Sequence, residues 1–170
     1  RSSDLQRLIY PSIEREVRND LTDTASENAM KVFAVNLKQL LMQPPVKGKT
    51  VLALDPGYRT GCKTAVVDST GKVLDTTVIY PTHSDKKIQE SKQTLLRLIK
   101  KHHVDIISIG NGTASKETEM FTAETIKEAD HPVYYMVVSE AGASVYSASK
   151  LAATELPDLD LTLRSAVSIA

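Results

Sequence analysis

Hydrophobic residues are spaced in two different ways along the chain. Before about residue 46 they recur at helical intervals, as at Ile13, Val17 and Leu21. Beyond that point, short apolar runs alternate with longer amphipathic stretches. The pattern therefore predicts a helical segment over residues 1–48 and an α/β domain over residues 49–170.

The helical segment is predicted to be one long helix or two shorter ones. Pro11 suits the first turn of a helix, and Pro44-Pro45 is expected to end it. Thr22-Asp23-Thr24 is the weakest point between them. A second set of apolar residues is expected to continue the stripe: Val32, Phe33, Leu37, Leu40 and Leu41. An isolated helix is marginal in water, so this stripe needs a packing partner.

Five apolar runs in the domain predict strands. They span residues 50–55, 63–68, 72–80, 104–109 and 133–138. The first three are too close together for helical crossovers, so they should form an antiparallel meander. Helices are expected at 84–102 and 116–129 and from about residue 143, which makes the later strands parallel. The order βββαβαβα indicates an α/β, ribonuclease-H-like fold: a mixed five-stranded sheet flanked by helices and preceded by the helical segment. One lobe of the actin-like ATPases shares this topology.

Composition narrows the class of protein. The 170 residues include 21 basic and 21 acidic side chains, so the chain is not a strongly basic nucleic-acid-binding domain. Cys62 is the only cysteine, which excludes an internal disulfide and argues against a cysteine-based zinc site. No apolar run reaches the roughly 20 residues that span a bilayer, and no secretory signal is visible, so we expect a cytoplasmic protein without a membrane partner. Both ends look cut, as in a fragment of a longer protein.

The first chemical motif is Asp55-Pro56-Gly57, where the first strand ends. A carboxylate at this position can bind a divalent cation, and glycine allows the backbone to approach a ligand closely. The alternative is an ordinary turn that begins at Asp55.

The second motif, Gly110-Asn111-Gly112-Thr113, follows the fourth strand and precedes a helix. Such a loop can present backbone N–H groups to a phosphate. The alternative is a tight turn with Thr113 or Ser115 as the helix N-cap.

Glu140 follows the fifth strand. It should lie beside Asp55 at the C-terminal edge of the sheet, with Asn111 nearby, if the first, fourth and fifth strands are neighbours. Two adjacent carboxylates could hold Mg²⁺ or Mn²⁺ for phosphodiester hydrolysis. The alternative is a helix N-terminal carboxylate favoured by the helix dipole.

Three segments, 55–63, 110–115 and 139–149, closely resemble the YqgF domain of the bacterial Tex transcription accessory proteins. The resemblance covers nearly the whole chain. It implies a ribonuclease-H-like fold related to the RuvC resolvases, within a longer protein that binds RNA or DNA and works with the transcription machinery. Asp55 and Glu140 would be the catalytic and metal-binding residues. Contacts to nucleic acid or phosphate are expected at Gly57, Arg59, Asn111, Gly112 and Thr113.

The sequence also departs from the pattern of these families. The arginine that usually follows the glutamate is Ala141 here, and the resolvase acid of the fourth strand is Asn111. A further acid is expected on the final helix, beyond Ala170. We therefore expect a non-catalytic or vestigial nuclease module. The alternatives are a metal-dependent RuvC-like endonuclease and the nucleotide-binding lobe of an actin-like ATPase.

Overall fold

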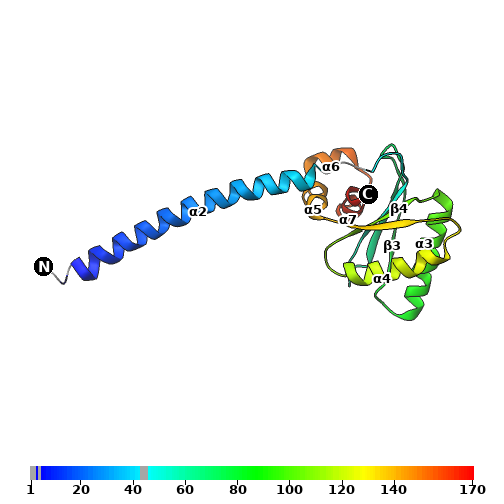
Figure 1. Ribbon diagram of the computed structural model, residues 1–170, viewed down its shortest axis with the longest axis horizontal. Helices are drawn as coiled ribbons and strands as arrows, with labels where there is room; N and C mark the ends of the chain where they lie inside the picture. The colour runs from blue at the N-terminus through cyan, green and yellow to red at the C-terminus, as the bar shows by residue number, and fades with distance from the viewer. Residues whose placement is uncertain (1–2, 4, 43–45) are drawn as a thin grey trace. The chain divides into compact units, whose positions relative to one another are not determined.

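The N-terminal unit is helical wherever the structure describes it. The computed structural model covers residues 3, 5–42 and 46–170, which divide into two units, 1–43 and 44–170. A π-helical turn, η1 (Leu5–Ile9), leads into the 32-residue helix α2 (Tyr10–Leu41) (Figure 1). Pro11 lies in the first turn of α2, as predicted, and the wider turn before it suits a residue that cannot donate a backbone hydrogen bond. Thr22-Asp23-Thr24 does not interrupt the helix, and Pro44-Pro45 lies outside the described residues.

The apolar residues of α2 do not form the single continuous stripe that we predicted. Ile13 and Leu40 are separated by about seven and a half turns at roughly 3.6 residues per turn, so they project to opposite sides. Val17 and Leu37 likewise differ by about half a turn. No described side chain of α2 is buried. Most apolar residues of the first half therefore lie on one side of the helix, and most of those in the second half lie on the other.

The second unit contains the predicted strands and helices in the predicted order. They are β1 (Val51–Asp55), β2 (Cys62–Val67), β3 (Val73–Ile79), α3 (Asp85–His102), β4 (Ile106–Gly110), α4 (Ser115–Thr125), the 3-10 turn η2 (Ile126–Glu128), β5 (Tyr134–Val138), α5 (Ala141–Ser147), α6 (Lys150–Glu155) and α7 (Leu161–Ile169). The helix expected to reach residue 129 ends in the 3-10 turn, and the last helical region is three short helices.

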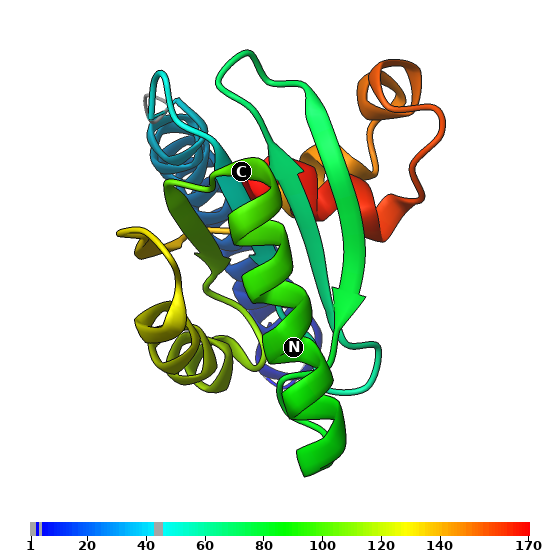
Figure 2. The same cartoon turned by 90° about the vertical axis from the view of Figure 1, so that its right-hand side faces the viewer.

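The strands form one mixed sheet in the order β3-β2-β1-β4-β5. The β1–β2 and β2–β3 pairs are antiparallel, whereas β1–β4 and β4–β5 are parallel (Figure 2). This arrangement confirms the predicted meander extended by two crossovers. It also brings the C-terminal ends of β1, β4 and β5 to the same edge of the sheet.

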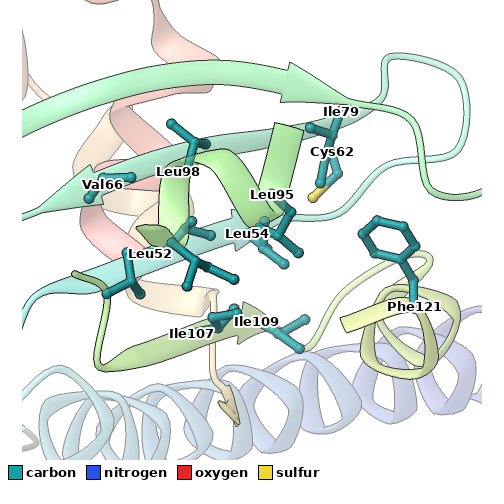
Figure 3. Close-up of a cluster of buried hydrophobic side chains, with 12 residues drawn as sticks. Leu52, Leu54, Cys62, Val66, Ile79, Leu95, Leu98, Ile107, Ile109 and Phe121 are labelled. Carbon is teal, nitrogen blue, oxygen red and sulfur yellow. The ribbon is translucent and has the colours of Figure 1, made fainter. Parts of the chain in front are cut away.

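The main hydrophobic core lies between the sheet and helices α3 and α4. Leu52 and Leu54 of β1 are fully buried there, against Leu95 and Leu98 of α3 and Phe121 of α4 (Figure 3). These leucines point to one face because successive side chains of a strand alternate. The residue between them must therefore point to the opposite face.

Helices α5 and α7 cover that opposite face at β1. Ala53 packs there against Ala143 of α5 and Ile169 of α7. Ala53 pairs with Ala65 of β2, and both are fully buried. Two small side chains side by side let α7 approach the backbone of β1 and β2 closely. Asp55 is the next residue of β1 whose side chain points to this face.

Candidate functional site

Asp55 ends β1 on the face covered by α7, where it is half-buried. The Ser165 side chain of α7 lies near it and favours its ionised form. Burial raises the pKa of Asp55 because a desolvated carboxylate is disfavoured, and this effect outweighs the opposing influence of Ser165 and Lys63. Asp55 thus resists ionisation unless further positive charge is nearby.

Glu140 follows β5 and immediately precedes α5. Its backbone N–H donates to Oδ1 of Asn111 at 3.2 Å, and the backbone N–H of Asn111 donates to the Val138 carbonyl at 3.0 Å. These two hydrogen bonds join the loop after β4 to the loop after β5. Asn111 therefore positions the backbone at Glu140 rather than acting as a free ligand.

Two glycines provide the space that the Glu140 carboxylate occupies. A Cβ placed on Gly112 would collide with this carboxylate, and one on Gly110 would collide with its Oε2. Oε2 is buried and has no hydrogen-bond partner among the described residues. A buried carboxylate oxygen without a partner is costly, so it calls for a proton or a cation. The glycines of this loop thus make room for Glu140, and their predicted contact with phosphate stays a prediction.

Asp55 and Glu140, named here the carboxylate pair, interact through their charges. Burial raises the pKa of Glu140, and the neighbouring Asp55 raises it further, while the backbone N–H of Gly112 acts in the opposite direction. Two partly buried carboxylates repel each other when both are ionised, which favours a proton or a bound cation between them. The structure therefore brings together Asp55, Glu140 and Asn111 at the sheet edge where we expected them.

Lys63 belongs to this site, although we did not predict it there. Lys63 pairs with Asp55 across the β1–β2 ladder. Its ammonium group contacts the Thr60 hydroxyl and donates to the Gly61 carbonyl at 3.3 Å, and its charge favours the ionised form of Asp55. The antiparallel hairpin was predicted, and its register would have placed a lysine opposite the aspartate.

Ser165 was also missed. It lies on α7, which packs on β1 and β2, and it lies near Asp55. The further acid that we expected beyond Ala170 stays a prediction. Leu161–Ile169 contains no acidic residue. Nowhere among the described residues do three or more His, Cys, Asp or Glu side chains gather in a way that could hold a metal ion.

The other predicted residues lie around the carboxylate pair without contacting it. Gly57 belongs to a tight turn, since a Cβ there would lie 3.1 Å from the Gly61 carbonyl oxygen. Arg59 and Thr113 are exposed. Within the described part of the chain, neither forms a hydrogen bond or ion pair with either carboxylate. They remain candidates for contact with nucleic acid.

The residues of this site suit a single cation better than a catalytic metal pair. The unpartnered Oε2 of Glu140 is a suitable oxygen ligand, and Asp55 could supply another. Two divalent cations, however, would bring four positive charges to a site that holds two carboxylates and the ammonium group of Lys63. A resident two-metal centre does not fit these residues.

The sheet order and the crossovers define a ribonuclease-H-like fold of the RuvC type. In agreement, the chain superposes on Thermus thermophilus RuvC, solved in complex with a Holliday junction substrate, with a TM-score of 0.51 and 16% sequence identity. The match covers 71% of this chain and 90% of that chain. At this level of identity the likeness concerns the fold.

The particular family follows from the sequence comparison. Residues 49–170 match the model of the Tex protein YqgF-like domain, so the chain belongs to that family. It is 52% identical over 165 residues to the Bacillus subtilis protein YdcI, covering 97% of this chain and 23% of the relative. It is also 52% identical over 163 residues to the transcriptional accessory protein Tex of Neisseria gonorrhoeae, covering 95% and 21%. The chain thus spans about a fifth of the length of these relatives. Among the helices described, none has the length and apolarity needed to cross a membrane.

Proposed function

We propose that residues 49–170 act as a nuclease-like module without nuclease activity, within a cytoplasmic protein that binds nucleic acid during transcription. The observation that carries this proposal is the surroundings of the carboxylate pair. Where a two-metal nuclease needs additional acids, this chain offers Ser165 against Asp55, and Asn111 is engaged with the backbone of Glu140. Both replacements are neutral, so neither can offset the charge of a second cation.

A link to nucleic acid is supported by the relatives and by the fold. One relative is described as a transcriptional accessory protein, and the matching RuvC structure contains a Holliday junction. Residues 49–170 contain 14 basic and 15 acidic side chains, so few phosphates can be neutralised. Affinity of this module for nucleic acid should therefore be weak and should depend only slightly on salt.

The test is incubation of the chain with four-way-junction DNA, single-stranded DNA and RNA in Mg²⁺ and in Mn²⁺. We expect no cleavage above the background of an Asp55→Asn control. Cleavage that disappears in Asp55→Asn would overturn the proposal and favour the endonuclease alternative.

A gain of function makes the test sharper. Ser165→Asp places a third carboxylate against Asp55, so it should increase Mn²⁺ affinity by about tenfold, as expected for an additional charged ligand. The matched control is Ser168→Asp, which adds the same charge at an exposed position of the same helix. Equal Mn²⁺ binding by both variants would show that a missing acid at position 165 does not limit the site.

A further inference from the structure

A groove lies along the outer edge of β3, and β5 forms the other edge of the same sheet. The groove has a volume of about 480 Å³ and lies between residues 73–76 of β3 and residues 155–159, which connect α6 to α7. Figure 2 shows this connection beside the outer edge of β3. We call it the edge groove. The edge groove is separate from the carboxylate pair, because Asp55 lies on β1 and β2 stands between β1 and β3.

The edge groove offers an unpaired strand. In the described part of the chain β3 pairs with β2 alone, so alternate backbone N–H and C=O groups point outward. Two of the usual protections of an edge strand are absent, since β3 contains no lysine and no proline, whereas one charge and one bulge are present. Its single charge, Asp75, is bound by Lys101 at 2.7 Å and His102 at 3.1 Å, both on α3. A bulge at Leu74 leaves the regular stretch from Asp75 to Ile79 for pairing.

The walls of the edge groove are apolar and acidic. Leu74 of β3 is 37% exposed, and Leu156 and Leu159 line the groove from the other side. Glu155 and Asp158 are exposed carboxylates of the same wall, and Glu155 accepts a hydrogen bond from the Tyr146 hydroxyl. No lysine or arginine lines the groove itself, although Arg164 donates to the Leu156 carbonyl at 3.1 Å. Such a surface repels phosphates, which makes nucleic acid a poor occupant. It attracts lysine and arginine side chains, particularly where apolar residues alternate with them.

We infer that the edge groove binds an extended basic segment of a partner protein, which adds a strand to β3. Main-chain hydrogen bonds to the open edge would hold the segment, its alternate apolar side chains would contact Leu74, Leu156 and Leu159, and its basic side chains would face Glu155 and Asp158. The β5 edge is also open and apolar, and we choose the β3 edge because of its groove and the carboxylates that line it.

The experiment uses the whole chain and fluorescein-labelled eight-residue peptides. One peptide alternates lysine and valine, and the comparison peptide alternates glutamate and valine. We expect saturable binding of the lysine peptide and at least about tenfold weaker binding of the glutamate peptide. Glu155→Gln/Asp158→Asn should weaken binding of the lysine peptide about fivefold, whereas the matched double variant Asp85→Asn/Glu124→Gln, outside the groove, should not.

Strand addition has a second signature that simple charge attraction lacks. Two lysine–valine peptides carry backbone N-methyl groups, one on every lysine and the other on every valine. A strand uses alternate N–H groups for pairing, so one of these peptides should lose about tenfold or more in affinity and the other should bind normally. Equal binding of both N-methylated peptides, or chemical-shift changes on β5 instead of residues 73–76 and 155–159, would overturn the inference. So would self-association of the chain through β3, which would make a second copy the occupant.

Discussion

The Glu140 carboxylate lies against the backbone of Gly112, in space that any other residue at position 112 would fill with its Cβ. This contact places an acidic side chain from the β5–α5 junction against the loop that follows β4. It explains a glycine of the Gly110-Asn111-Gly112 motif without invoking a ligand. It also makes the geometry of the carboxylate pair sensitive to a single methyl group.

Gly112→Ala should destabilise the chain by about 1 kcal/mol, at the low end of overpacking costs, because the colliding atoms are the far end of the flexible Glu140 side chain and can move aside. Urea denaturation of the full chain measures this change. In a Glu140→Ala background the same substitution should cost markedly less, since the colliding carboxylate is gone. Equal costs in the two backgrounds would show that the contact does not limit the packing of position 112.

The carboxylate pair should make stability depend on pH. Burial raises the pKa of both Asp55 and Glu140, so the folded state retains protons that the unfolded state releases. Their contribution is therefore fully present below the ordinary pKa values of about 3.8 and 4.5, and it is lost as pH rises through the raised values. Glu140→Gln should become progressively more stable relative to the unmodified chain as pH rises from about 4.5.

The check is urea denaturation across this pH range, with Glu124→Gln on α4 as a control for the loss of one exposed carboxylate. The difference between Glu140→Gln and the unmodified chain should shrink when Mn²⁺ is added, because a cation relieves the repulsion between the carboxylates. A difference that stays constant with pH would contradict the assigned electrostatics.

The contacts of His131 should stabilise the fold at low pH and lose this effect as pH rises. An ordinary paired carboxylate does the opposite. Nε2 of His131 lies 2.9 Å from the Val104 carbonyl oxygen and its Nδ1 lies 2.6 Å from Oδ1 of Asp130. Both contacts are hydrogen bonds only when the ring is doubly protonated, and they raise the pKa of His131 above its ordinary value of 6.5. This stabilisation is fully present below about pH 6.5 and is lost as pH rises through the raised pKa.

His131→Asn should therefore lower the melting temperature more at pH 6 than at pH 8. His83→Asn, at an exposed loop position, is the matched control and should lack this contrast. The same loss at both pH values would show that the imidazolium form is not what the fold stabilises.

Removal of residues 1–45 should leave the remaining chain folded. The described side chains of α2 are not buried, and residues 46–170 have a core of their own around Leu52, Leu54 and Leu95. Circular dichroism and cooperative urea unfolding of the shortened chain measure the outcome. Leu95→Ala in the same background should cost about 2–5 kcal/mol, whereas Leu151→Ala, 58% exposed, should cost less than about 0.5 kcal/mol. An unfolded shortened chain would show that the two parts do not fold separately.

The fold could be predicted from sequence because strand spacing limits connectivity. At most seven residues separate consecutive apolar runs between residues 50 and 80, which is too few for a helical crossover, so these strands had to be antiparallel. Asp55 and Glu140 could be predicted for the same reason, since parallel strands end at one edge. Lys63 could have been found from the hairpin register alone.

Other features depend on tertiary packing that the sequence pattern does not reveal. Ser165 faces Asp55 only because Ala53 and Ala65 let α7 lie close to the sheet. A short, mostly apolar helix with two serines gives no signal of that contact. The apolar residues of α2 keep helical spacing within each half, but the two halves differ by about half a turn, which local spacing does not reveal.

The space that Gly110 and Gly112 leave for the Glu140 carboxylate has an evolutionary consequence. A site whose shape depends on missing side chains can be lost by gaining a single carbon atom, even when both acids are retained. If the carboxylate pair has no remaining function, substitutions at Gly110 and Gly112 should accumulate among related sequences about as freely as at neighbouring exposed positions. If the pair still binds a proton or a cation for a purpose, selection should keep these two glycines as strictly as it keeps Glu140.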